Sequence, residues 1–160
     1  IMSMYQCATR TNYFQVNDEE KFRELMGHVV SAEDKVELFE KERDGVRYFA
    51  FGCYSSIEGV DRAEYCRACE LGYGPDDDEF DEEDYIASRD NVFITMLQKL
   101  VAEDDAIIII EAGHEKLCYV TGIAEIITRG GYRYVDLSNA AVEVAEMMLG
   151  NSEWSTKMEY

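Results

Sequence analysis

The stretch AIIIIEAGHEKLCYVTGIAEIITRGGYRYVDL, residues 106–137, decides the fold. Its first part, AIIII at 106–110, is a short apolar run that is typical of a buried strand. AGHE at 112–115 predicts a turn, and LCYVTGIAEIIT at 117–128 predicts a long second strand. The glycine pair at 130–131 predicts a tight turn into a third strand. Strands joined by such short connections pair antiparallel, so this stretch predicts an antiparallel sheet.

A further hairpin is predicted upstream. VELF at 36–39 alternates as a strand does, and VRYFAFGCY at 46–54 is its predicted partner. Between them, Asp44 and Gly45 form a dipeptide that is a strong hairpin signal. Residues 4–16 favour another strand because they include several aromatic and β-branched residues.

Helical spacing separates these strands. Asn17 is expected to cap a first helix, with Glu20 three residues on as its capping-box partner. Its apolar face carries Phe22, Leu25, Met26 and Val29. Asp136 or Ser138 is expected to cap a last helix, which Gly150 ends. The apolar residues of that last helix are Ala141, Val144, Ala145, Met148 and Leu149.

Two more helices are predicted in the middle of the chain, a short one at 60–71 and a longer one at 85–101. The order of elements predicts the α+β class, a mostly antiparallel sheet with about three helices packed on it. We expect residues 1–160 to form a single domain, since this length can bury a real core. An acidic helical or loop insertion is expected at about 72–88, and a C-terminal tail at 151–160 whose only tryptophan docks on the body.

The charge of the chain points to one class of partner. It has 34 acidic and 15 basic residues, a formal net charge of −19. Direct nucleic-acid binding needs a basic face, so it is disfavoured, as is an anionic membrane surface. A basic protein or a cation is the expected partner, and no cofactor is predicted. The chain has no apolar run of the roughly 20 residues that a membrane span needs.

Other features of the sequence indicate a cytoplasmic protein. No signal peptide precedes the first charged residues, and we expect Met2 to be the natural start. The 5 cysteines are an odd number without a dense disulfide pattern, which favours a reduced compartment.

The acidity peaks in DDDEFDEED, residues 76–84. If this run extended the following helix backwards from Ala87 to Asp78, its charges would repeat about every 1.5 Å. Duplex DNA carries one phosphate charge per about 1.7 Å, so such a helix would resemble DNA to a basic groove. The predicted partner-binding residues are Asp76, Asp77, Asp78, Glu79, Asp81, Glu82, Glu83 and Asp84, with Phe80 and Tyr85 as aromatic contacts or anchors. The alternatives are a solvated loop or a metal site, although the spacing lacks the glycine of a calcium loop.

No catalytic residue is predicted. Cys66 and Cys69 form a C-x-x-C pair, and His114 follows Glu111 at a metal-ligand spacing, so these residues are weak metal candidates. The cysteine pair lacks a second pair, and the residues before it do not form the strand of a thioredoxin-like motif. Structural roles are the simpler interpretation of both groups.

The opening YQCATRTNYFQVNDEEKF and the segment AIIIIEAGHEKLCYV resemble small acidic proteins carried on conjugative elements and phages of gut Firmicutes. That resemblance implies a defence inhibitor, because acidic antirestriction proteins and some anti-CRISPR proteins act as DNA mimics. It assigns no role to any single residue.

Together these observations predict a non-enzymatic, cytoplasmic acidic protein from a mobile element. It would inhibit a defence system by binding a basic nucleic-acid-handling protein in place of nucleic acid. Three alternatives stay open: an immunity protein against a basic nuclease toxin, a metal-dependent enzyme, and a purely structural accessory protein.

Overall fold

Strands and helices intermix along the chain in a computed structural model that describes residues 4–33 and 35–154. The elements in chain order are β1 (Tyr5–Thr11), α1 (Glu19–Met26), β2 (Val29–Ser31), β3 (Glu37–Arg43), β4 (Val46–Cys53), β5 (Ile57–Val60), α2 (Arg62–Ala68), α3 (Glu82–Leu100), β6 (Ile107–Glu115), β7 (Tyr119–Thr128), β8 (Gly131–Asp136) and α4 (Leu137–Leu149). This is the predicted α+β class.

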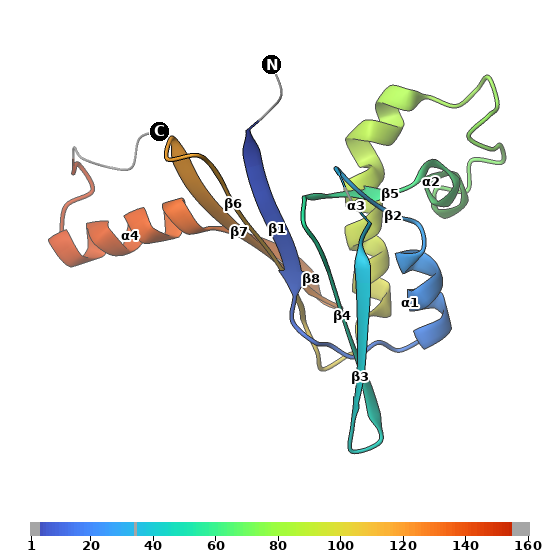
Figure 1. Cartoon of the computed structure of the whole chain (residues 1–160), viewed down its shortest axis with the longest axis horizontal. Coiled ribbons are helices and arrows are strands. Elements are labelled where there is room, and N and C mark those ends of the chain that lie inside the picture. The colour runs from blue at the N-terminus through green and yellow to red at the C-terminus, as the bar shows by residue number, and fades with distance from the viewer. Residues whose placement is uncertain (1–3, 34, 155–160) are drawn as a thin grey trace.

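Six of the strands form one antiparallel sheet in the spatial order β3-β4-β1-β6-β7-β8. β6 lies near the middle of the sheet, between β1 on one side and β7 on the other. This position confirms that the stretch 106–137, which carries β6, β7 and β8, organises the sheet. α1, α2 and α3 lie on one side of the sheet, whereas α4 lies on the other side (Figure 1). The remaining strands, β2 and β5, form a separate two-stranded sheet.

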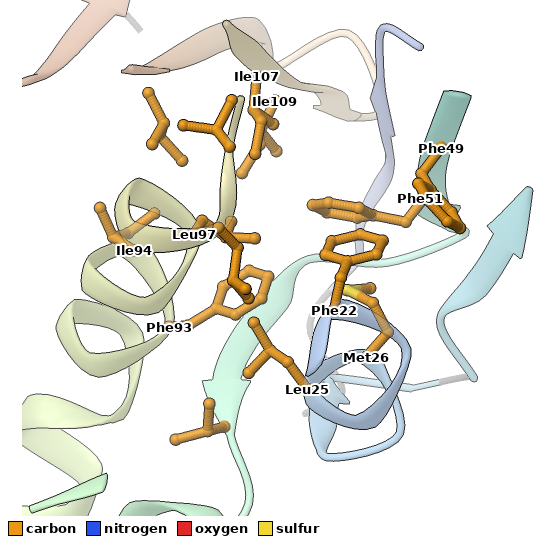
Figure 2. Close-up of a cluster of buried hydrophobic side chains, with 14 of the residues drawn as sticks. Phe22, Leu25, Met26, Phe49, Phe51, Phe93, Ile94, Leu97, Ile107 and Ile109 are labelled. Carbon is orange, nitrogen blue, oxygen red and sulfur yellow. The ribbon is translucent and has the colours of Figure 1, made fainter. Parts of the chain in front are cut away.

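The core lies between the sheet and the helices α1 and α3 (Figure 2). Alternation along each strand directs every second side chain to this side. Ile107 and Ile109 of β6 and Phe49 and Phe51 of β4 are therefore buried. Aromatic rings from distant segments meet edge to face here, as Phe51 and Phe93 do with ring centroids 6.0 Å apart.

Some boundaries differ from those predicted. AGHE at 112–115 lies inside β6, and the chain turns at 116–118 instead. Gly113 indicates close strand packing here, because a Cβ at this position would lie 2.5 Å from the carbonyl oxygen of Gln6 on β1. The cap of α1 is Asp18, whose side chain accepts the Lys21 amide, and not Asn17.

The β2–β5 pair was missed because both strands are only three or four residues long. Gly59 of β5 has φ +124°, and a Cβ there would lie 2.4 Å from the Arg89 backbone of α3. Glycine therefore permits this strand to approach the helix closely. The predicted hairpin is confirmed, with Asp44 and Gly45 at φ 53° and 78° as a turn of the favoured type requires.

α4 is the predicted last helix, with Asp136 as its cap and Gly150 in the left-handed conformation at its end. Its apolar side chains, however, are not packed. None of its residues is buried, and Met148 is 83% exposed. Beyond it, Trp154 is half-buried, and the rest of the predicted tail, 155–160, lies outside the described residues.

The register of β6 gives a direct test of this fold. Ile109 is 5% exposed and its neighbour Ile110 is 51% exposed, because they point to opposite faces of the sheet. Ile109→Ala is expected to lower the free energy of unfolding by about 2–5 kcal/mol. Ile110→Ala is the matched control and is expected to cost below about 1 kcal/mol. Chemical denaturation at low protein concentration measures both, and equal losses would contradict the register.

Candidate functional site

The eight acids of the segment 76–84, here called the acidic segment, are all exposed. Residues 72–80 form turns between α2 and α3, and α3 begins only at Glu82. The expectation that the helix extends back to Asp78 is therefore wrong. Asp81 ends that extension because its side chain caps α3, accepting the amides of Glu83 and Asp84 over 3.0 and 3.2 Å.

Local hydrogen bonds fix the shape of the acidic segment. The Gly74 amide donates to Asp77 Oδ2 over 2.6 Å, and the Phe80 amide donates to the Asp77 carbonyl over 3.0 Å. Asp77 and Asp81 thus hold the backbone from two points. The acids are presented by an ordered turn followed by the first turn of a helix, where negative charge is also favoured by the helix dipole.

Aromatic rings anchor the acidic segment to the body. Phe80 packs against Tyr65 and Tyr85, with ring centroids 6.2 and 5.8 Å away. Tyr85 is only 2% exposed, and its hydroxyl donates to the Val60 carbonyl over 2.8 Å. Of the two roles predicted for Tyr85, contact with a partner or anchoring, its position fits the anchor, because its ring and its hydroxyl are used inside the protein. Phe80 is half-buried in the same cluster, as an anchor requires.

Most charge in the acidic segment is uncompensated. Arg62 Nε donates to Glu82 Oε2 over 2.9 Å, and Asp77 and Asp81 accept backbone amides as above. Across residues 4–33 and 35–154, no ion pair involves the other five acids, which are Asp76, Asp78, Glu79, Glu83 and Asp84.

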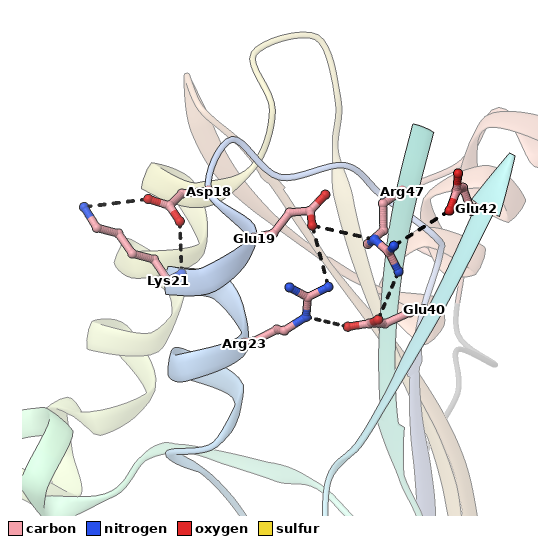
Figure 3. A network of polar contacts seen from close by, with 7 residues as sticks. All are labelled: Asp18, Glu19, Lys21, Arg23, Glu40, Glu42 and Arg47. Carbon is pink, nitrogen blue, oxygen red and sulfur yellow. Dashed lines mark hydrogen bonds and ion pairs between the residues drawn. The ribbon is translucent and has the colours of Figure 1, made fainter. Parts of the chain in front are cut away.

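Nearby arginines do not neutralise these acids, because they are paired elsewhere. Arg89 bonds Glu58 over 2.9 Å, and Arg67 bonds the buried Glu64. Away from the acidic segment, on α1 and the β3–β4 hairpin, Arg23 and Arg47 share carboxylates in a connected network (Figure 3). Arg23 Nε donates to Glu40 over 2.7 Å, and this bond lowers the pKa of the Glu40 carboxyl.

The weak metal candidates do not meet in space. Cys66 lies buried inside α2, and Cys69 is exposed at its end. Burial raises the pKa of the Cys66 thiol, which makes it less reactive. His114 is exposed on β6 and points away from Glu111, because residues three apart in a strand face opposite sides. No three His, Cys, Asp or Glu side chains in the described part of the chain are placed to hold a metal ion.

A carboxylate cluster that sequence reasoning missed lies on the helix side of the sheet. Asp90, Glu111 and Glu125 line a cavity of about 20 Å³, which is room for one water molecule. The Tyr5 hydroxyl donates to Glu111 over 3.1 Å, and the Tyr132 hydroxyl donates to Glu125 over 2.9 Å. An acid on the apolar face of a strand, such as Glu111 two residues after Ile109, was the available signal.

Burial raises the pKa of Asp90 and of Glu125, and the nearby carboxylates raise that of Glu125 further. The cavity is too small for an organic substrate, and the tyrosine hydroxyls already satisfy two of the carboxylates. Neighbouring carboxylates in this partly buried site disfavour one another's ionisation. The site has no room for a reactant, so the exposed acidic segment is the stronger functional candidate.

No protein family model, curated protein or solved structure matches this chain. Among its described helices, none combines the length and apolar character that crossing a membrane requires.

Tyr85→Phe tests the anchoring role. It removes the hydroxyl that bonds the Val60 carbonyl, so the free energy of unfolding is expected to fall by about 1–3 kcal/mol. Tyr134→Phe changes a ring that is 54% exposed and is the control, with an expected change below about 0.5 kcal/mol. Equal stability of the Tyr85 variant and the wild type in urea unfolding would contradict the anchor.

Glu125→Gln tests the half-buried carboxylate that lines the cavity. A raised pKa in the folded state means that ionisation of Glu125 destabilises the fold, so stability falls as pH rises through that pKa. The variant is expected to melt at a higher temperature than wild type at neutral pH, with no difference at acidic pH. Glu103→Gln, at an exposed acid, controls for the general loss of one negative charge. If the melting temperatures of the variant and the wild type differed by the same amount at every pH, a raised pKa of Glu125 would be contradicted.

Proposed function

We propose that this protein is a non-enzymatic inhibitor that binds a basic nucleic-acid-handling protein through the acidic segment. The observation that carries the proposal is a set of five exposed acids that make no ion pair within the described part of the chain. Their backbone is held in place by hydrogen bonds and aromatic packing. A solvated loop has no need for such anchoring. A binding surface benefits from it, because a fixed segment loses little conformational entropy on binding.

The chemistry of the segment suits arginine-rich and lysine-rich surfaces. Carboxylates accept paired hydrogen bonds from arginine as phosphates do. The net charge of −19 would also accelerate the encounter with a basic partner. With only the first turn of α3 helical in this region, the resemblance to nucleic acid rests on the density and exposure of charge, not on a long helical row of acids.

A cytoplasmic location and a role in blocking host defence belong to the same proposal. They are supported by the resemblance to small acidic proteins of mobile elements, and by the disfavoured direct binding of nucleic acid. The partner would be an enzyme whose groove normally holds a polyanion, such as a restriction or CRISPR nuclease.

The structure allows a sharp test of the segment. Asp76→Asn, Asp78→Asn, Glu79→Gln, Glu83→Gln and Asp84→Asn together remove five charges but leave Asp77, Asp81 and Glu82 to hold the backbone. Exposed ion pairs are worth about 0.2–1 kcal/mol each, so partner affinity is expected to fall roughly tenfold or more. The measurement is retention of host-lysate proteins at low salt, with elution by a salt gradient and by competing duplex DNA.

The control carries the same charge loss elsewhere, at the exposed acids Glu20, Glu33, Glu37, Glu103 and Asp104. Wild type and control are expected to retain a basic nucleic-acid-binding protein that duplex DNA displaces, and the segment variant to release it at lower salt. Equal retention by all three proteins would contradict the proposal. A captured nuclease toxin would assign the same surface to an immunity protein.

A further inference from the structure

The side of the sheet turned away from α3 is less covered than the helix side, and Ile110 and Val135 on it are 51% and 43% exposed. On β1, β6, β7 and β8 it presents a continuous apolar surface, here called the open face, whose larger members are Ile108, Ile110, Val120, Ile126 and Val135. One row runs across four strands, from Arg10 to Ile110, Ala124 and Val135. Apolar patches of this extent on a folded protein mark an interaction surface.

α4 has the same property and lies next to the open face. Leu137 at its start contacts β7, where a Cβ on Gly122 would lie 3.3 Å from the leucine side chain. From there the helix stands away from the sheet (Figure 1). Met147 and Met148 are 81% and 83% exposed. A helix that is apolar on most sides normally packs against something. In the described chain α4 contacts β7 and β8, but Met147, Met148 and Leu149 stay exposed.

The charges of these two surfaces are complementary. The described strands β1, β6, β7 and β8 direct no acid to the open face, although the whole chain carries −19. Their charged side chains on this face are Arg10 and Arg133. α4 has no basic residue and carries the exposed acid Glu143. α4 of one molecule therefore matches the open face of another in both apolar character and charge.

We propose that the open face binds a second copy of this chain, with α4 of each copy lying across the sheet of the other. A symmetric dimer of this kind covers both exposed surfaces of both molecules at once. It also places the interface opposite the acidic segment, which lies at the far end of the molecule between α2 and α3 (Figure 1). That separation keeps the acidic segments of the two copies away from each other.

The dimensions fit this arrangement. The 13 residues of α4 make a helix roughly 20 Å long at about 1.5 Å per residue. Four strands spaced about 4.8 Å apart, with β6 rising about 3.4 Å per residue, give a face roughly 15 by 30 Å. Sheet and helix together approach the area of about 800 Å² per partner that a stable interface needs, whereas either surface alone falls short.

The test uses the full chain and two single substitutions at positions exposed in the monomer. Met148→Glu changes α4, and Ile110→Glu changes the open face. Ile86→Glu, at an exposed isoleucine in the second turn of α3, is the matched control. Sedimentation equilibrium measures mass over a range of protein concentrations and salt. Circular dichroism verifies that each variant is folded.

Wild type and the Ile86 variant are expected to reach twice the monomer mass of 18.4 kDa, and the other two variants to stay monomeric. Added salt is expected to strengthen the dimer, because it screens repulsion between two molecules of charge −19.

A monomeric wild type would overturn the proposal and leave residues 155–160 or a different protein as the cover. A dimer that survives either substitution, while that variant remains folded, would also overturn it. Partner capture by the acidic segment is a separate measurement, so failure of one proposal does not imply failure of the other.

Discussion

Packing of α1 and α3 against a single face of the sheet is the constraint on which the rest of the structure depends. Alternation along β6 places Ile107 and Ile109 in this core, and pairing with β1 and β7 carries the same register across the sheet. The aromatic side chains Phe22, Phe51 and Phe93 then fill the space between sheet and helices. All of this burial is on one side, so the opposite side of the sheet is left open.

The two sides of the sheet also differ in charge. The helix side and its loops carry the dense acids, and the arginines there are committed to specific carboxylates, as in the network around Arg23 and Arg47 (Figure 3). The five acids of the acidic segment that make no ion pair among the described residues lie on that side. On the open face the exposed charges are arginines set among aliphatic residues. The molecule thus has two chemically different surfaces, and we expect binding at them to respond to salt in opposite directions.

Strongly periodic features could be predicted from the sequence, but contacts between distant segments could not. The Asp44-Gly45 turn, the Asp136 cap and the Gly150 stop follow from local backbone chemistry, which the sequence displays directly. Gly113 was misread because a glycine required by a neighbouring strand has the same appearance in sequence as one required by a turn.

The acidic segment shows the same limit. Its exposure followed from its charge, but the point where α3 begins depends on whether Asp81 caps the helix or continues it. The burial of Tyr85 depends on α2 and β5, which are distant from it in sequence. The carboxylate cavity needs the register between β6 and β7, so Glu111 and Glu125 could not be paired in advance. The exposure of α4 is likewise a tertiary property, since its sequence pattern is that of a packed helix.

Amide hydrogen exchange of the wild-type protein, alone and with a captured basic partner, tests the division into two surfaces most directly. We expect the partner to slow exchange in residues 72–87 and to leave exchange in α4 and at the edges of the open face unchanged. Raising the protein concentration without a partner is expected to slow exchange in α4. Protection by the partner in α4 or β8, with residues 72–87 unaffected, would show that the anchored acidic segment is not the partner-binding surface.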